Sequence, residues 1–410
     1  MSSFDDMLTG LARLLADNGI GLDRLTPRPR GNRMPQEDRE SIESILDDLD
    51  VILGDRVLHG SGSQAADSEE QPNGGVSEDR ASALVYANGC FSVRRYEAAS
   101  EAYIQLLEAD RSDTSAGFNL GLCHLRERRH GDAVAAFTDL LQTDPDMAEA
   151  CYQRGNAYDD LDEGDLALAD YSRAIELKPD YLQAYYNRGV VLARLGRHQE
   201  AVEEFGIVIG MQPSLSNAHL NLGASLDELD RHDDAIAAYT EAVRCNPDNA
   251  NAYFNRARTH YFLGYIQETI DDYTDAIGLA PDDAEAFNNR GLAHDAAGDY
   301  QKAVEDYGEA MALRDGFAEA ISNRGAALEA LDDLKGALED YQSALSLAPR
   351  FAAAHYNAAR LHAKLGDLDQ CLVHLEEAVD VEPGLRDEAT RDDNLGWVLK
   401  LRTLKEDLAR

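Results

Sequence analysis

The residues of this 410-residue chain best suited to recognition chemistry are asparagines that recur at multiples of 34 positions. An amide side chain both donates and accepts hydrogen bonds, so a row of amides can pair with the backbone of an extended peptide whatever its sequence. The alternative is that each amide only hydrogen-bonds a neighbouring turn of its own chain. The row consists of Asn119, Asn187, Asn221, Asn255, Asn289, Asn323 and Asn357.

Aromatic and acidic side chains follow the same spacing. An aromatic residue directly precedes the amide position at Phe118, Tyr152, Tyr186 and Phe254, and would supply apolar contact area beside the amides. A carboxylate lies six positions after the amide position at Asp159, Asp227 and Asp295. Together these residues predict a peptide-binding face with an acidic centre, which favours a basic or neutral extended ligand.

A second row carries arginine, and each arginine has a carboxylate 16 positions later. Where the arginine is missing, the partner position holds Ala or His instead of an acid. Two positions that change together indicate a contact. We therefore predict five structural ion pairs: Arg154 with Asp170, Arg188 with Glu204, Arg256 with Asp272, Arg290 with Asp306 and Arg324 with Asp340.

An internal repeat positions all of these residues. Within each unit, position 8 is Gly or Ala, position 20 is small, and position 24 is aromatic in eight of nine copies. Small and large side chains at fixed offsets predict two closely packed helices in each unit. The nine units span residues 80–113, 114–147, 148–181, 182–215, 216–249, 250–283, 284–317, 318–351 and 352–385.

The pattern resembles the tetratricopeptide repeat, a 34-residue helix–turn–helix unit. The resemblance implies an all-α fold: an α-solenoid in which the repeats form a right-handed superhelix, with the first helix of each repeat lining the concave face. It also implies that the amide row, the aromatics and the acids lie on that face. Members of the family that read chaperone tails hold a C-terminal carboxylate with Lys or Arg at position 5, where this chain has no base.

The segments outside the repeats have their own patterns. Residues 1–58 contain two amphipathic helical stretches and are expected to be partly disordered, whereas 59–79 reads as a flexible acidic linker. The N-terminal helices either cap the array or bind back into its groove. Residues 386–410 are expected to form a C-terminal capping helix over the ninth repeat.

Charge excludes several classes of partner. The chain carries 77 Asp and Glu against 38 Lys and Arg, a net charge of −39, which argues against nucleic acid and anionic membranes. The acid-rich, lysine-poor composition is typical of proteins from salt-loving microbes, although a GC-rich genome produces the same bias. The sequence has no apolar stretch long enough to span a membrane and starts without a signal-peptide pattern, so a cytoplasmic location is expected.

Motifs of catalysis are missing, so we expect no enzyme, no catalytic residue and no cofactor. The sequence lacks a phosphate-binding loop, HExxH and GxSxG. His355, His362, Cys371 and His374 stand at positions 4, 11, 20 and 23 of the ninth unit, and the first three face the hairpin interior. Substitution of core residues accounts for them better than a metal site. The expected function is a non-enzymatic scaffold that binds a peptide or partner segment. The alternative is a recognition or assembly subunit for an enzyme acting in trans, such as a glycosyltransferase or a secretion factor.

Overall fold

The computed structural model describes residues 75–400, and within that range the chain forms helices and turns without strands. The described residues divide into two units, one ending at Ala102 and the other beginning at Tyr103. The amphipathic stretches predicted within residues 1–58 lie outside the described residues. Within the described range, no helix combines the length and apolar character needed to cross a bilayer.

In the first unit, helix α3 (Gly75–Ser92) turns into α4 (Tyr96–Ala109), which crosses the boundary between the units. The rings of Phe91 and Tyr96 meet edge to face at 5.4 Å across this turn. Helix α3 begins five residues before the predicted start of the repeats, and therefore includes the last residues of the segment predicted as a linker. This extension is possible because residues 76–80 contain neither Gly nor Pro to end a helix.

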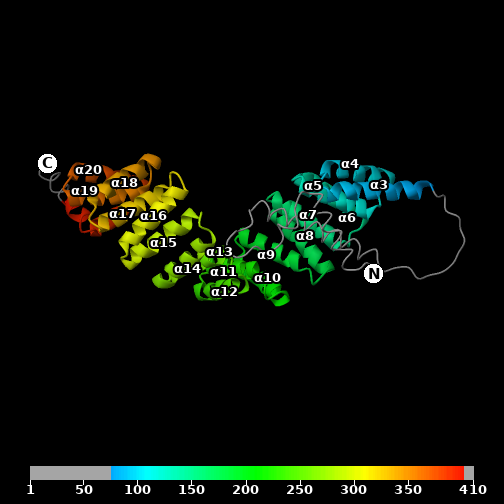
Figure 1. Cartoon of the computed structure of the whole chain (residues 1–410), viewed down its shortest axis with the longest axis horizontal. Coiled ribbons are helices and arrows are strands. Elements are labelled where there is room, and N and C mark those ends of the chain that lie inside the picture. Colours follow the sequence, from blue (N-terminus) through cyan, green and yellow to red (C-terminus); the bar gives the residue numbers. More distant parts are fainter. Residues whose placement is uncertain (1–74, 401–410) are drawn as a thin grey trace, which may run out of the picture. The chain divides into compact units, whose positions relative to one another are not determined.

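The second unit continues as a series of helical hairpins in chain order (Figure 1). The first helices of the hairpins begin where the 34-residue register places each unit. They are α5 (Thr114–Arg126), α7 (Ala148–Asp160), α9 (Leu182–Arg194), α11 (Ser216–Asp227), α13 (Ala250–Phe262), α15 (Ala284–Ala297), α17 (Ala318–Ala330) and α19 (Ala352–Leu365). The predicted all-α solenoid is thereby confirmed as a fold class.

The second helices return antiparallel to the first and pack against both neighbouring first helices. First helices of adjacent repeats also touch each other from α5 to α19, so one face of the stack is built by first helices alone. The second helices are α6 (His130–Thr143), α8 (Gly164–Leu177), α10 (His198–Met211), α12 (His232–Cys245), α14 (Ile266–Leu279), α16 (Tyr300–Leu313), α18 (Leu334–Leu347) and α20 (Leu368–Val381).

The turn between the two helices of each repeat adopts one backbone conformation. Position 15 has a positive φ of 57–81° in all nine repeats, and is Gly in four of them and Asp in three. Both residue types enter this left-handed region more readily than others. The turn thus repeats every 34 residues as a backbone property and directs every second helix the same way.

In most hairpins the core is an aromatic side chain of the second helix packed against a glycine of the first helix. In six repeats the aromatic residue at position 24 packs on the glycine at position 8, and a Cβ added to that glycine would lie 2.5–2.9 Å from the ring. Phe137, Tyr171, Phe205, Tyr239, Tyr307 and Tyr341 are all fully buried by this arrangement. The glycine therefore sets the distance between the two helices.

The C-terminal segment covers the last hairpin. Helix α21 (Leu385–Arg391) is followed by a break at Asp392 and by helical residues 395–400. Leu395 and Val398 are buried against Tyr356 and Leu375 of the ninth repeat. The segment predicted as one capping helix is thus interrupted within its described part, because the Asp392 carboxylate accepts hydrogen bonds from the backbone N–H groups of residues 394 and 395 and starts a new helix.

We predict that Gly291→Ala destabilises the seventh hairpin, because its new Cβ would meet the Tyr307 ring at 2.7 Å. Overpacking of this kind costs about 1–3 kcal/mol. Gly308, in the second helix of the same hairpin, is the matched control, since nothing lies within 4 Å of an added Cβ there. Gly308→Ala should leave stability unchanged or raise it by up to about 1 kcal/mol. Urea denaturation followed by circular dichroism measures both, and equal effects would contradict the close approach.

Candidate peptide-binding site

The asparagine row lies on the first helices, and part of it joins adjacent repeats. Three amides donate from Nδ2 to the side chain 35 residues earlier, which is position 5 of the preceding repeat. The bonds join Asn187 to the Tyr152 hydroxyl (3.0 Å), Asn221 to the Tyr186 hydroxyl (3.0 Å) and Asn323 to Asn288 Oδ1 (3.1 Å). These amides stabilise the register between repeats, a contact that neither reading of the sequence included.

Two members of the asparagine row, Asn255 and Asn357, remain available to a ligand. Of the others, Asn119 is buried, and Asn289 accepts a hydrogen bond from Asn288. Across residues 75–400, the side chains of Asn255 and Asn357 have no hydrogen-bond partner, and both are half-buried. We call Asn255 and Asn357 the open amides, because their donors and acceptors are available to a ligand.

The position-5 aromatics contribute to the hairpins on which they stand. Each ring packs against the position-24 ring of its own repeat, with centroids 5.4–6.0 Å apart. All four are half-buried, so part of each ring stays accessible. The four rings are Phe118, Tyr152, Tyr186 and Phe254.

The predicted acidic residues are engaged within the chain. Asp227 accepts hydrogen bonds from the Tyr239 hydroxyl at 2.9 Å and the Thr259 hydroxyl at 2.6 Å, and its other oxygen lies 3.1 Å from His232 Nδ1. Asp295 accepts from the Tyr307 hydroxyl at 2.8 Å. Because these carboxylates are hydrogen-bonded within the chain, they are less available to a ligand than the sequence spacing indicates.

Partial burial also changes the acidity of this wall. Burial raises the pKa of Asp295, and the Tyr307 hydroxyl that donates to it offsets part of the rise. Burial likewise raises the pKa of Asp159, although Arg194 of the next repeat forms an ion pair with it and opposes the rise. The predicted acidic centre therefore consists of carboxylates that are internally bonded and only partly hydrated.

Helix α13 exposes aromatic residues that the sequence analysis did not select. Phe262 is 70% exposed and Tyr261 is 39% exposed, at positions 13 and 12 of the sixth repeat. The Phe262 ring also lies 4.6 Å from the ring of His232 in the preceding repeat. The signal was present in the sequence, because no other repeat has two aromatic residues at positions where Asp, Glu, Arg and Ala prevail.

The structure brings together all five predicted ion pairs. Four arginines donate from Nε and Nη2 to both oxygens of an aspartate at 2.6–2.9 Å, whereas Arg188 makes one bond of 2.7 Å to Glu204. The acid side chains are only 7–12% exposed. Two-pronged geometry and burial make these pairs part of the hairpin core.

Four of these arginines also reach the preceding repeat. The guanidinium Nη1 donates to a hydroxyl at position 25 of that repeat, in the pairs Arg154–Thr138, Arg188–Ser172, Arg256–Thr240 and Arg290–Thr274 at 3.0–3.2 Å. Arg324 has Gly308 at the equivalent place, and it is the most exposed of the five at 29%. A hydroxyl residue 16 positions before the arginine was the sequence signal for this contact.

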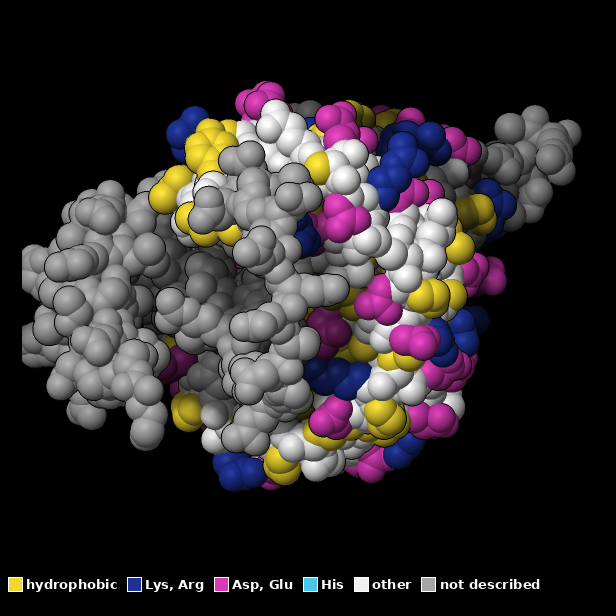
Figure 2. Space-filling view, turned by 90° about the vertical axis from the view of Figure 1, so that its right-hand side faces the viewer, with side chains coloured by type: hydrophobic (Ala, Val, Ile, Leu, Met, Phe, Trp, Pro, Cys, Tyr) yellow, Lys and Arg dark blue, Asp and Glu magenta, His cyan; other side chains and the backbone are white. Residues whose placement is uncertain are grey.

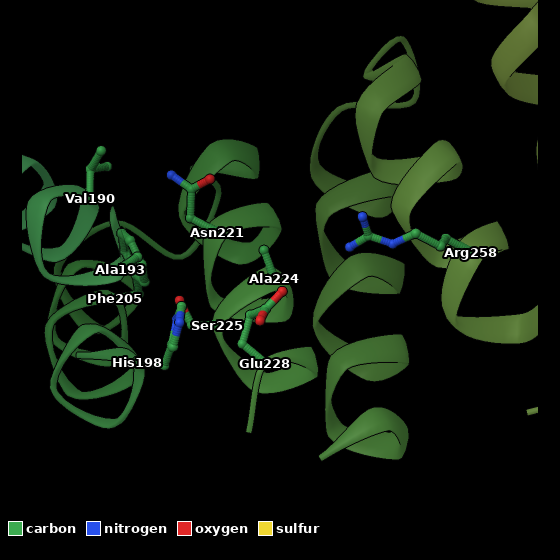
Figure 3. Close-up of a pocket in the computed structure, with 9 residues that line it drawn as sticks. All are labelled: Val190, Ala193, His198, Phe205, Asn221, Ala224, Ser225, Glu228 and Arg258. Carbon is green, nitrogen blue, oxygen red and sulfur yellow. The ribbon is translucent and has the colours of Figure 1, made fainter. Parts of the chain in front are cut away.

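A cavity of about 160 Å³ opens on the first-helix face between the fourth and fifth repeats (Figure 3). Ala193 and Ser225 line it from α9 and α11, His198 and Phe205 line it from α10, and Arg258 reaches it from α13. Ser225 is 2% exposed. Among the described residues, neither its hydroxyl oxygen nor His198 Nδ1 has a hydrogen-bond partner, although both atoms are buried.

The histidines of the ninth repeat form a packed cluster. Nδ1 of His355 lies 3.0 Å from Nδ1 of His374, and the His362 ring stacks on His374 with centroids 5.5 Å apart. Burial and the two neighbouring imidazoles lower the pKa of His374 to about 4. Between residues 75 and 400, no group of three or more His, Cys, Asp or Glu side chains is arranged to hold a metal ion.

Comparison with known families decides the assignment. Models of the tetratricopeptide repeat match the chain at residues 91–148, 163–196, 182–214, 228–264, 250–283, 284–317 and 352–377. Together these matches span more than half of the chain. The chain belongs to the tetratricopeptide repeat family. Membership supports a role as a protein-interaction scaffold.

Several solved structures match parts of the chain. The crystal structure of the MamA protein is 24% identical, with a TM-score of 0.41 over 43% of this chain and 96% of that one. The TPR protein YrrB is 21% identical, with a TM-score of 0.40 over 49% and 99%. The APC/C hetero-tetramer Cut9–Hcn1 is 17% identical, with a TM-score of 0.46 over 80% and 77%. No curated protein matches the chain.

We predict that Arg290→Leu lowers the free energy of unfolding by about 3 kcal/mol, because it leaves the buried Asp306 carboxylate without its partner. The double variant Arg290→Leu/Asp306→Ala should recover most of this loss, since it installs the neutral Leu–Ala combination that the fifth repeat carries at Leu222 and Ala238. Chemical denaturation of the three proteins measures the effect. A double variant as unstable as the single one would contradict a pairwise role.

A second prediction concerns pH. The pKa of His374 is about 4 in the folded chain, below the usual value of about 6.5 in the unfolded chain, so the unfolded state takes up the proton first. The stability contributed by the neutral ring is complete above pH 6.5 and is lost as the pH falls towards 4. His374→Ala, which installs the residue of other neutral repeats, should show a smaller fall in Tm between pH 7 and pH 5. Parallel melting curves that lose the same Tm would refute this.

Proposed function

We propose that the chain is a non-enzymatic scaffold whose first-helix face binds an extended, basic or neutral segment of a protein partner. The observation that carries the proposal is the open face of α13. Asn255, Arg258 and Phe262 stand at i, i+3 and i+7 on this helix and therefore share one side. The first two make no side-chain hydrogen bond within residues 75–400, and the third is largely exposed.

The chemistry of this face matches an extended peptide. The open amides can hydrogen-bond a peptide backbone in either direction, which needs no particular sequence. The exposed rings of Tyr261 and Phe262 supply an apolar anchor, and a ring face also attracts the cationic head of Lys or Arg. Asp227 and Asp295 of the fifth and seventh repeats are bonded within the chain, so the preference for a basic or neutral ligand rests on the exposed carboxylate of Glu228.

Surface charge on the second helices is mixed. In the view of Figure 2, acidic side chains lie among basic and apolar ones over the described surface. Ion pairs within one helix, such as those of Arg197 with Glu200 and Arg231 with Asp234, neutralise part of the outer acid. Selectivity for a basic or neutral segment is therefore proposed for the first-helix face and not for the whole surface.

Selection of peptides on the full-length chain tests the proposal. A random peptide library displayed in equal numbers of basic, neutral and acidic members should yield basic and neutral binders. Asn255→Ala/Asn357→Ala should weaken the selected peptides about tenfold, because each lost hydrogen bond contributes about 0.5–1.5 kcal/mol, while Tm stays unchanged. Asn187→Ala is the matched control, since its amide joins two repeats and its loss should lower Tm. Selected peptides of net negative charge, or affinities that the double variant leaves intact, would refute the proposal, whereas a single carboxylate within a basic or neutral peptide would not.

Self-binding by the N-terminal helices is distinguished in the same assay. If residues 1–58 occupy the face, a chain that lacks them should bind the selected peptides more tightly than the full-length chain. If they only cap the array, the affinity should stay the same while Tm falls.

A further inference from the structure

The cavity between the fourth and fifth repeats coincides with a local change in the repeat pattern. One repeat later, the same place is filled by the Asp227 carboxylate, which is held by three side chains. They are His232, Tyr239 and Thr259, located 5, 12 and 32 residues after Asp227. The residues around Asp227 can therefore be compared, position by position, with those that line the cavity.

In the fourth repeat, the residue equivalent to Asp227 is Ala193. The same offsets of 5, 12 and 32 residues lead to His198, Phe205 and Ser225, and all four residues line the cavity. The fourth repeat therefore has two of the three donors, but a methyl group where the fifth repeat has the carboxylate that they would bind. Phe205 also lacks the hydroxyl of Tyr239, which leaves more space.

Both of these donors are buried and are among the side-chain atoms without partners in the described chain. Ser225 Oγ and His198 Nδ1 have no hydrogen-bond partner in the described chain, whereas their counterparts Thr259 and His232 contact Asp227 at 2.6 and 3.1 Å. A buried donor without a partner costs about 1–3 kcal/mol. A carboxylate that entered the cavity would satisfy both atoms at once.

We infer that this cavity is a binding site for a carboxylate that a ligand supplies in place of the missing Asp at position 193. The volume of about 160 Å³ exceeds the roughly 30 Å³ of one water molecule, and so admits a carboxylate with its adjoining carbon atoms. Arg258 lines the same cavity from α13 and adds positive charge at its mouth (Figure 3). The two donors without partners, Ser225 and His198, stand at positions 10 and 17 of their repeats.

Glu228 is the opposing charge at this site. It is exposed and lines the same cavity, so it repels an incoming carboxylate and competes for Arg258. The Asn221 amide, which also lines the cavity, already donates one hydrogen to Tyr186 and has a second one available. The donors at the site are thus Ser225, His198, Asn221 and Arg258, against one exposed acid.

The inference extends the proposed function, because a peptide on the first-helix face would present the carboxylate as an Asp or Glu side chain or as its own C-terminus. The site itself can be tested without a peptide. N-acetylglycine amide carries no carboxylate, N-acetylglycine represents a chain end, and N-acetyl-aspartate N-methylamide represents a side chain. Binding of either acid, with no binding of the neutral amide, supports the inference and identifies the source.

Binding is read from the imidazole ¹⁵N shifts of His198 in the full-length chain, titrated across the millimolar range. A saturable shift is expected with at least one acid. Ser225→Ala should weaken it about tenfold, and Glu228→Gln should strengthen it. Absence of any saturable shift, with water as the only occupant, would overturn the inference even if the peptide selection succeeds; a saturable shift stands even if that selection fails.

A second experiment places a carboxylate of the chain itself in the cavity by substitution. Ala193→Asp restores the carboxylate of the fifth repeat, and should raise Tm by about 2 °C and abolish binding of the acids. Ala363→Asp is the matched control: it places an aspartate at the same position of the ninth repeat, where the residues 5, 12 and 32 positions later are all leucine. This control should lower Tm. If both aspartates lower Tm alike, the donors do not form a carboxylate site.

Discussion

The close approach of a position-24 ring to the bare backbone at position 8 is the contact on which the packing of six of the nine hairpins depends. It fixes the separation of the two helices, since a Cβ at position 8 would lie within 3 Å of the ring in all six glycine-bearing repeats. In the seventh repeat, at this separation, the guanidinium at position 7 reaches the acid at position 23 and the phenol at position 24 reaches the acid at position 12. The sixth repeat makes the first of these contacts, from Arg256 to Asp272, with Ala257 at position 8, so the ion pair tolerates a methyl group there.

The polar contacts between positions 7 and 23, and between positions 12 and 24, are present in some repeats and absent from others. Position 7 with position 23 is either Arg with an acid or an uncharged combination such as Leu222 with Ala238. Position 12 with position 24 is Asp227 with Tyr239 in the fifth repeat, but Ala193 with Phe205 in the fourth. The first contact is replaced as a unit in every repeat, which fits the high cost of leaving one charged partner buried alone. The second contact is not, because the sixth repeat has Tyr261 at position 12 together with Tyr273 at position 24.

In the fifth repeat the acid at position 12 has three donors, which stand on two different repeats. At the equivalent place in the fourth repeat, Ala193 and Phe205 lack the acid and the phenol, while Ser225 and His198 present buried donors. A fold selected only for stability would have apolar groups in these places, as the ninth repeat and the segment after it do with Leu368, Leu375 and Leu395. Retained donors around an empty acceptor position are the physical basis for assigning a ligand there.

Much of this architecture could be predicted from the sequence, because nine copies in one chain act as their own alignment. The starts of the first helices from α5 to α19 and the five Arg–carboxylate contacts follow from the register and from positions that change together. The bonds from Asn187 and Asn221 to the preceding repeat could not be predicted, since they depend on how one hairpin is rotated against the next. The cavity could not be predicted for a related reason. Ala193 and Phe205 are common residues at their positions, and their lack of a carboxylate and a hydroxyl creates a cavity only because three helices meet there.

The net charge of −39 has a narrower meaning once these contacts are counted. Five carboxylates are bound to the position-7 arginines, and those at position 12 are bonded to hydroxyl groups or to Arg, so the long-range field arises mainly from the hydrated acids outside these contacts. That field is screened over about 8 Å at physiological ionic strength, and over less in concentrated salt. Charge can therefore speed the encounter with a basic segment, whereas the choice of ligand rests on groups that act at contact distance: the open amides, the rings of α13 and the unfilled carboxylate position.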